Sequence, residues 1–157
     1  MAKGMMEKLC CLITLLFFYS TAALATEKVE RINISVPVAH EVHTIERGAY
    51  SSQSAFPKGE LRLLENQAAF DEFYSALMSH KLPPAKAPPI NFSNQILLAV
   101  VDKSRSTGGY AVSIKSIKRI EKEIYELTID YTSPKKGTMR TMALTKPFHI
   151  IALDIKQ

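Results

Sequence analysis

The chain has 157 residues, of which 46% are hydrophobic, 22% charged and 8% aromatic, with a formal net charge of +5 at pH 7. This composition is typical of a globular protein and excludes a disordered chain, a collagen-like repeat and a membrane channel. The basic surplus is mild and spread along the sequence, so it does not favour nucleic acid as a partner. The length predicts one domain.

The first residues have the pattern of an export signal. Lys3 and Lys8 precede an apolar run, Leu9–Tyr19, and Ala23-Leu24-Ala25 supplies the small-x-small triplet of a signal peptidase site. As a helix the run would span about 16 Å, well short of a bilayer core of about 30 Å, which disfavours a retained anchor. We predict a cleaved signal peptide over residues 1–25, a periplasmic or extracellular protein, and no stable membrane span after cleavage.

Both cysteines, Cys10 and Cys11, lie inside this apolar run. Neither follows the Leu-small-small triplet of a lipoprotein signal, so no lipid anchor is predicted. Cleavage leaves a mature chain without cysteine, which removes disulfides, thiolate catalysis and cysteine-ligated zinc together.

The first part of the mature chain, residues 26–47, is predicted to be an extended or strand segment. Apolar residues alternate from Ile32 to Val38, and Pro37 favours an edge position. Further extended stretches are predicted over Val42–Arg47 and Glu60–Leu64.

A helix is predicted over about residues 67–80, capped by Asn66. Its apolar stripe is predicted to pack on the domain's own sheet rather than on a partner, and consists of Phe70, Phe73, Tyr74, Leu77 and Met78. The proline-rich segment over residues 83–89 is predicted to be a stiff connector.

A β-meander is predicted over residues 96–155. Its strands are Ile96–Asp102, Gly109–Lys118 with a bulge before Ile117, Ile124–Thr132, Met139–Leu144 and Phe148–Ile155. The predicted fold class is α+β: a mostly antiparallel β-sheet, meander or sandwich-like, with one amphipathic helix packed on it.

The sequence contains no recognisable catalytic, cofactor or metal motif. His40 and His43 are the one histidine pair at ligand-like spacing, but in an extended segment they point to opposite faces. His149 is interpreted as a hydrogen-bonded structural histidine. The prediction is therefore no enzyme. A deep pocket lined by His149 and converging acids would instead favour an unrecognised hydrolase or ligand-binding enzyme.

Two predicted loops stand out as a partner-binding site. If alternate connections of a meander lie at one end of the sheet, Arg105–Gly109 and Ser133–Gly137 are neighbours. Paired glycines allow close backbone approach, and an aromatic side chain can anchor an interface. The predicted partner-binding residues are Thr107, Gly108, Gly109, Tyr110, Pro134, Lys135, Lys136 and Gly137. The alternative is a pair of ordinary turns.

Several motifs resemble, in their order, the PrcB-type protease-complex subunits. They cover roughly residues 48–155 and are Gly48-Ala49-Tyr50-Ser51, the helix around Phe70–Leu77, Pro89-Ile90-Asn91-Phe92, Thr107–Tyr110, Ser133-Pro134 with Gly137, and Leu144–Pro147. The family's usual Asp is replaced by Asn91, and its lipoprotein cysteine is absent. The resemblance implies a PrcB-like domain over residues 48–157. It further implies an exported, non-catalytic subunit that associates with and stabilises a secreted serine protease.

The Thr107–Tyr110 loop is also similar to a loop of chagasin-like cysteine-protease inhibitors, which are immunoglobulin-like sandwiches that insert loops into a protease cleft. The preceding Asn-Pro of that family is missing here, and no tryptophan follows Pro147. The two functional hypotheses are thus an accessory subunit of a secreted or envelope protease complex and, as the alternative, a protease inhibitor. Both take a protein, a protease, as partner and need no cofactor or metal. The sequence leaves the oligomeric state open.

Overall fold

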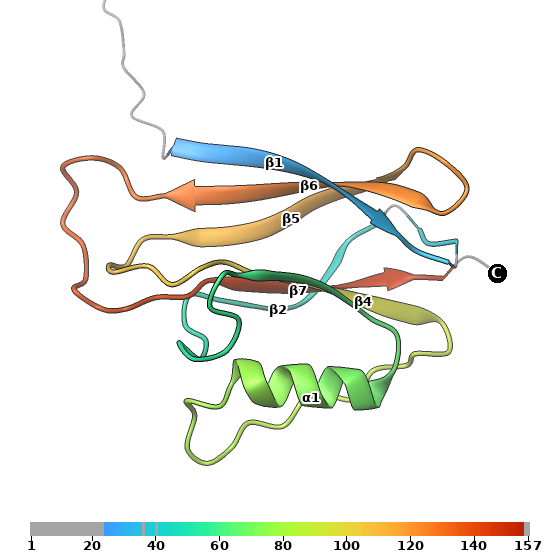
Figure 1. Cartoon of the computed structure of the whole chain (residues 1–157), viewed down its shortest axis with the longest axis horizontal. Coiled ribbons are helices and arrows are strands. Elements are labelled where there is room, and N and C mark those ends of the chain that lie inside the picture. The colour runs from blue at the N-terminus through green and yellow to red at the C-terminus, as the bar shows by residue number, and fades with distance from the viewer. Residues whose placement is uncertain (1–23, 36, 40, 156–157) are drawn as a thin grey trace, which may run out of the picture.

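The computed structural model describes residues 24–35, 37–39 and 41–155. Nearly all of the predicted signal peptide lies outside these residues, as does His40, so cleavage stays a prediction. Within the described residues the chain forms seven strands in two antiparallel sheets and one short helix (Figure 1). The predicted fold class, α+β with mostly antiparallel sheet, is confirmed.

The two sheets divide the strands unevenly. The four-stranded sheet has the order β2-β7-β4-β3 and consists of β2 (His43–Gly48), β3 (Glu60–Leu64), β4 (Gln95–Val101) and β7 (Phe148–Asp154). The three-stranded sheet has the order β1-β6-β5 and consists of β1 (Leu24–Asn33), β5 (Ala111–Arg119) and β6 (Ile124–Ser133). The chain therefore forms a sandwich rather than one continuous meander: it leaves one sheet after β4 and returns with β7.

The strand predicted over Met139–Leu144 does not form, and that prediction is wrong. Among the described residues no strand pairs with this segment. Its neighbourhood instead bonds to the β4–β5 loop at separate points, through Gly108 N to Thr141 O and through the bridge between Arg105 and Thr145. The segment therefore forms a loop despite its β-like composition, because a strand needs a continuous ladder of backbone hydrogen bonds to a partner strand.

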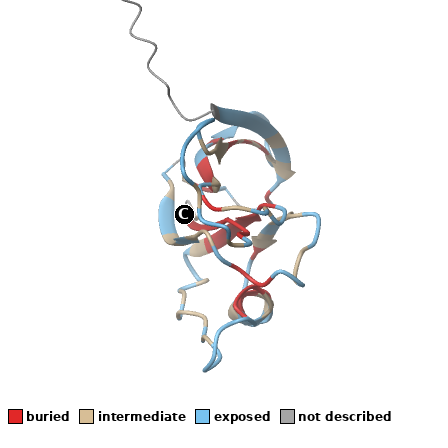
Figure 2. Ribbon diagram, turned by 90° about the vertical axis from the view of Figure 1, so that its left-hand side faces the viewer, coloured by how far each residue is buried: buried red, intermediate tan, exposed pale blue. Residues whose placement is uncertain are grey.

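The four-stranded sheet is covered on both faces. Leu98, Val100 and Ile151 face the first core, which lies between the two sheets. Leu97 and Ala99 face a second core, which lies between the same sheet and the helix. Figure 2 shows buried residues in both places. A strand buried on both faces must be apolar at consecutive positions, which explains the unbroken apolar run from Ile96 to Val101.

Helix α1 (Gln67–Leu77) covers the outer face of the four-stranded sheet. The Asn66 side chain caps it by accepting a hydrogen bond from Ala69 N at 2.9 Å, as predicted. The apolar stripe is buried against the sheet, which confirms that it packs internally. The helix ends at Leu77, earlier than predicted, with Met78 as its C-cap.

The proline-rich connector returns alongside the helix. The Gln67 side chain fixes the end of the connector. Its Oε1 accepts from Ile90 N at 3.0 Å and its Nε2 donates to Pro88 O at 3.3 Å. Ala85 and Ala87 are partly buried against the second core. The connector therefore packs on the domain and is part of its fold.

Two features of the three-stranded sheet were anticipated in part. The bulge predicted in β5 is present, as a register shift against β6 between Ile114 and Ser116. The first strand begins earlier than the predicted Ile32 and ends at Asn33, although Ile34 and Val38 beyond it are buried in the first core. The Tyr125 hydroxyl accepts from Val38 N at 3.1 Å and holds this crossing segment in place.

Candidate functional site

The two loops singled out in the sequence lie side by side at one end of the sandwich, on the left of Figure 1. The β4–β5 loop covers residues 102–110 and the β6–β7 loop covers residues 134–147. They meet because β5 and β6 are antiparallel neighbours, with Ala111 opposite Thr132. The predicted proximity of the two loops is confirmed. The reason differs from the predicted one: both loops cross from one sheet to the other, and the pairing of β5 with β6 brings them together. We refer to the two loops together as the rim.

Both glycines of the first loop are explained by contacts within the rim. Gly109 has a φ of +87°, and a Cβ there would lie 2.8 Å from Pro134 Cβ. A Cβ on Gly108 would overlap Thr141 Oγ1. Gly108 is buried and Gly109 is exposed. The absence of side chains at these positions lets the two loops approach each other, whatever else the loops do.

Hydrogen bonds brace the rim across the same contact. Gly108 N donates to Thr141 O at 2.9 Å, and Arg105 and Thr145 exchange two backbone bonds of 2.8 and 3.0 Å. The Thr145 hydroxyl donates to Thr107 O at 2.8 Å. Motif residues that lie far apart in the sequence are therefore partners, and they hold the rim in one shape.

A charged and aromatic cluster stands on the first loop. The Arg105 guanidinium donates to Asp102 Oδ2 through Nε at 2.8 Å and lies 2.7 Å from it at Nη2. The same guanidinium lies 4.8 Å from the centre of the Tyr110 ring. Tyr110 is half-buried, so part of its ring remains open to solvent. The arrangement fixes the orientation of an amphipathic side chain of the kind enriched at protein interfaces.

The second loop presents the predicted basic turn. Lys135, Lys136 and Gly137 are exposed, whereas Pro134 is half-buried against Gly109. Gly137 has a φ of +78°, and a Cβ added there would meet no atom within 4 Å. This glycine therefore serves the turn conformation alone.

Sequence reasoning missed the role of Lys146, which is fully buried at the end of the second loop. Its ammonium donates to the carbonyl oxygens of Ala55 and Gln53, the latter at 3.4 Å. Its backbone is bonded to Ala49 and to the Ser51 hydroxyl, both at 2.9 Å. Burial lowers the pKa of Lys146. A lysine between Thr145 and Pro147 gave no signal of burial, since lysine is usually exposed.

His149 is buried and takes part in structural hydrogen bonds, as interpreted from the sequence. Its Nδ1 accepts from Ile114 N at 2.9 Å, so its Nε2 carries the proton of the neutral ring and lies 2.9 Å from Thr44 Oγ1. Burial, with smaller contributions from Arg47 and Lys115, lowers the pKa of His149 to about 4. The histidine joins the two sheets across the first core.

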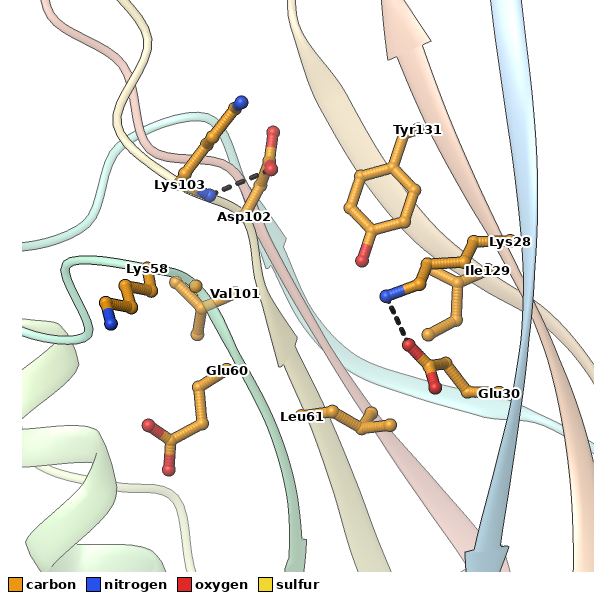
Figure 3. A pocket seen from close by; sticks show the side chains of 11 residues that line it. Lys28, Glu30, Lys58, Glu60, Leu61, Val101, Asp102, Lys103, Ile129 and Tyr131 are labelled. Carbon is orange, nitrogen blue, oxygen red and sulfur yellow. Dashed lines mark hydrogen bonds and ion pairs between the residues drawn. The ribbon is translucent and has the colours of Figure 1, made fainter.

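A cavity of about 230 Å³ lies at the open side of the sandwich, between β1 and β3 (Figure 3). Tyr131 and Leu61 point into it near the ion pair of Lys28 with Glu30. Burial raises the pKa of Tyr131. His149 is not among its lining residues, so the arrangement that would favour a hydrolase is not found at this cavity.

The part of the chain that the structure describes contains no cluster of three or more His, Cys, Asp or Glu side chains placed to hold a metal ion. Within the same residues, no helix is long and apolar enough to cross a membrane.

Comparison with known proteins gives one family match. Residues 96–154 match the family model described as PrcB C-terminal. No curated protein and no solved structure matches the chain. The match runs from β4 to β7 and includes both rim loops, but neither α1 nor the first three strands. Residues 96–154 therefore carry a PrcB C-terminal domain.

Proposed function

We propose that this protein is an exported, non-catalytic protein-binding module that acts as an accessory or stabilising subunit of a secreted or envelope protease complex. The export-signal pattern of residues 1–25 and the PrcB C-terminal match support this reading. The contact surface is the rim, with Thr107, Gly108, Gly109, Tyr110, Pro134, Lys135, Lys136 and Gly137 as its partner-binding residues.

The observation that carries the proposal is the bracing of the rim. Two loops from separate parts of the chain are locked together through Gly109 with Pro134 and through the bonds of Thr145. A preorganised surface loses little conformational entropy when it binds, which favours affinity. The rim also presents a tyrosine, an arginine and two lysines, and tyrosine and arginine are enriched among residues that dominate binding energy.

The side chains around the glycines, rather than the glycine backbone, make the contact in this proposal. Gly108 is buried and Thr107 O is already bonded to Thr145. Among the proposed partner-binding residues, the side chains of Lys135 and Lys136 and part of the Tyr110 ring are open to solvent.

The inhibitor alternative has one observation in its favour. The protein is a two-sheet sandwich that carries both loops at one end, as a cleft-inserting inhibitor does. Insertion would require the Thr107–Tyr110 backbone to enter a narrow cleft, and the burial of Gly108 against Thr141 opposes that. The accessory role is therefore preferred.

The test combines binding with protease activity. Purified chain lacking residues 1–25 is mixed with a secreted serine protease from the same cell envelope, and separately with a papain-like cysteine protease. Co-elution in size-exclusion chromatography with a longer active half-life of the serine protease is the expected result. Loss of protease activity on mixing would support the inhibitor, and no complex with either protease would contradict both.

Variants locate the contact surface. Tyr110→Ala combined with Lys135→Glu and Lys136→Glu is expected to weaken the complex at least tenfold, since an interface tyrosine alone contributes about 2 kcal/mol or more when it is a hot spot. The matched control is Lys118→Glu with Lys122→Glu at the other end of the sandwich, which should bind normally. Equal binding by both variants, with folding intact, would remove the rim as the contact surface.

A further inference from the structure

The β6–β7 loop exposes three large apolar side chains close together in sequence. The exposed fractions are 101% for Met139, 91% for Met142 and 62% for Leu144. Single exposed apolar residues are common on protein surfaces and need no explanation. Here two side chains are as exposed as in an isolated peptide, so they pack on no other part of the described chain, within a loop that is otherwise bonded to its neighbour.

The same loop is basic and free of acidic residues. From Tyr131 to Leu153 the sequence contains no Asp or Glu. Lys135 and Lys136 are exposed and Arg140 is half-exposed, whereas Lys146 is buried and contributes nothing to the surface. The acid of the adjoining loop, Asp102, is engaged by Arg105. We call residues 135–144 the basic tip.

The basic tip projects beyond the strand ends in Figure 1. It is held there from behind, because Thr141 O accepts from Gly108 N and Thr145 is bridged to Arg105. The apolar side chains and the cations are therefore carried outward on a braced loop.

We propose that the basic tip docks on the surface of an anionic phospholipid bilayer. The two methionines and Leu144 enter the boundary between headgroups and acyl chains, while Lys135, Lys136 and Arg140 contact lipid phosphates. Apolar burial combined with basic charge is the physical basis of interfacial membrane binding. This inference shares Lys135 and Lys136 with the protease-partner proposal, but it is carried by the exposed methionines and Leu144, which that proposal does not use.

Charge and shape together favour a membrane over an acidic protein. The cations complement either partner, but a protein must offer a pocket shaped to each protruding side chain. A lipid interface accepts an irregular apolar tip without shape complementarity, and the side chains of Met139 and Met142 are almost fully exposed. If the protein does not bind anionic vesicles, the membrane proposal is wrong and an acidic protein becomes the expected partner of the basic tip.

The first experiment measures vesicle binding directly. Residues 26–157 are used, because the apolar signal segment would itself bind lipid, and all buried residues of both cores lie between 34 and 153. Circular dichroism verifies folding. Sedimentation with phosphatidylcholine vesicles, and with vesicles that also contain phosphatidylglycerol, should show binding to the anionic vesicles that weakens with added salt.

A fluorescent reporter tests insertion of the tip. The chain contains no tryptophan, so Met142→Trp introduces a single one. Its emission should shift to shorter wavelength when anionic vesicles are added. The control is Leu82→Trp, at a position that is also 91% exposed but lies after the helix, and its emission should not shift.

Charge and apolar variants separate the two contributions. Lys135→Gln, Lys136→Gln and Arg140→Gln together should lower the partition coefficient roughly 100-fold, since each basic residue near an anionic surface contributes about fivefold. The matched triple variant of Arg31, Lys118 and Lys122 to Gln removes the same charge elsewhere and should lower it far less.

Met139→Ser with Met142→Ser should lower partitioning at least about tenfold, because two methionine side chains no longer enter the interface. Leu82→Ser is its control and should bind as the parent does.

Three results would overturn the proposal. These are absence of binding to anionic vesicles at low salt, equal losses in the tip and control triples, and full binding by the methionine double variant. The last would reduce the interaction to general charge attraction.

Discussion

The two sheets of this protein differ in how completely they are covered. In the four-stranded sheet, β4 and β7 are buried on both faces, between the three-stranded sheet and helix α1. In the three-stranded sheet, the outer face has no covering layer among the described residues, and β1 is exposed at most positions. Strand length is therefore a poor guide to stability here: the ten-residue β1 contributes little apolar burial, while the seven-residue β4 lies in both cores.

Strand β1 is exposed because it places charged side chains on its inner face. Lys28 and Glu30 lie opposite Ile129 and Leu127 of β6, so they share the face that looks toward the first core. Charged side chains cannot close that side of the sandwich with apolar contacts, and the cavity of Figure 3 lies there. Inward-pointing charges on an edge strand also oppose pairing with another chain.

The largest effect is expected in the second core, between the doubly covered sheet and helix α1. Phe73→Ala removes a ring that is 1% exposed and stacks on Phe56 with 5.0 Å between ring centres. The loss should be about 3–5 kcal/mol in the free energy of unfolding, measured by urea denaturation. Leu82→Ala, at an exposed position, is the control and should change stability by less than about 0.5 kcal/mol. A loss that small at Phe73 would place the helix stripe outside the core.

The free energy of unfolding should fall in acid because of His149, which is hydrogen-bonded to both sheets. His149 has a pKa of about 4 in the folded protein, below the ordinary value of 6.5, because it is buried. Between these values the unfolded chain binds a proton that the folded protein does not, so the free energy of unfolding falls as pH decreases from 6.5 toward 4. The slope from this group is at most about 1.4 kcal/mol per pH unit.

Measurement between about pH 7 and pH 5 avoids most carboxylate titration. His149→Gln, which does not titrate, should lose this part of the pH dependence. An NMR titration of the parent should show the His149 ring unprotonated at about pH 5.5. Protonation of that ring near its ordinary value of about 6.5 would contradict the prediction.

The rim allows a matched pair of glycine substitutions. Gly109→Ala introduces a Cβ close to Pro134 at a φ of +87°, whereas Gly137→Ala meets no atom at a φ of +78°. We expect losses of about 1–3 kcal/mol at Gly109 and about 1 kcal/mol at Gly137, measured by thermal unfolding. Equal losses would mean that backbone conformation alone, and not the contact between loops, requires glycine at position 109.

The smallest effect is expected on β1. Val29 is 57% exposed on the strand that contributes least to the core. Val29→Ala should therefore change the free energy of unfolding by no more than about 0.5 kcal/mol. A loss above about 1.5 kcal/mol would show that the outer face of the three-stranded sheet is covered in solution.

Local patterns predicted most of the elements. Glu60–Leu64 coincides with β3, the Asn66 cap and the apolar stripe define α1, and the phase shift in β5 is a bulge. The predictions failed where an apolar segment had no partner strand, as at Met139–Leu144. Alternation reports only that a segment could pair, and pairing depends on what lies beside it.

The candidate site was predicted in outline. The two loops were identified and are neighbours, but their shared position follows from the pairing of β5 with β6. The rationale for the glycines was incomplete, because Gly108 and Gly109 are required by Thr141 and Pro134 of the opposite loop. Such contacts join residues more than twenty positions apart and leave no local pattern in a sequence.

The amino-acid order by itself determined helix α1 and which segments could form strands, since hydrophobic period, caps and prolines act over a few neighbouring residues. It also supplied a loop rich in lysine, arginine and methionine. Only the tertiary structure decided which sheet each strand joins, that Lys146 is buried against the carbonyls of Gln53 and Ala55, and that the basic tip faces outward. These outcomes depend on the simultaneous packing of distant segments, where burial of apolar faces outweighs the preference of any single residue.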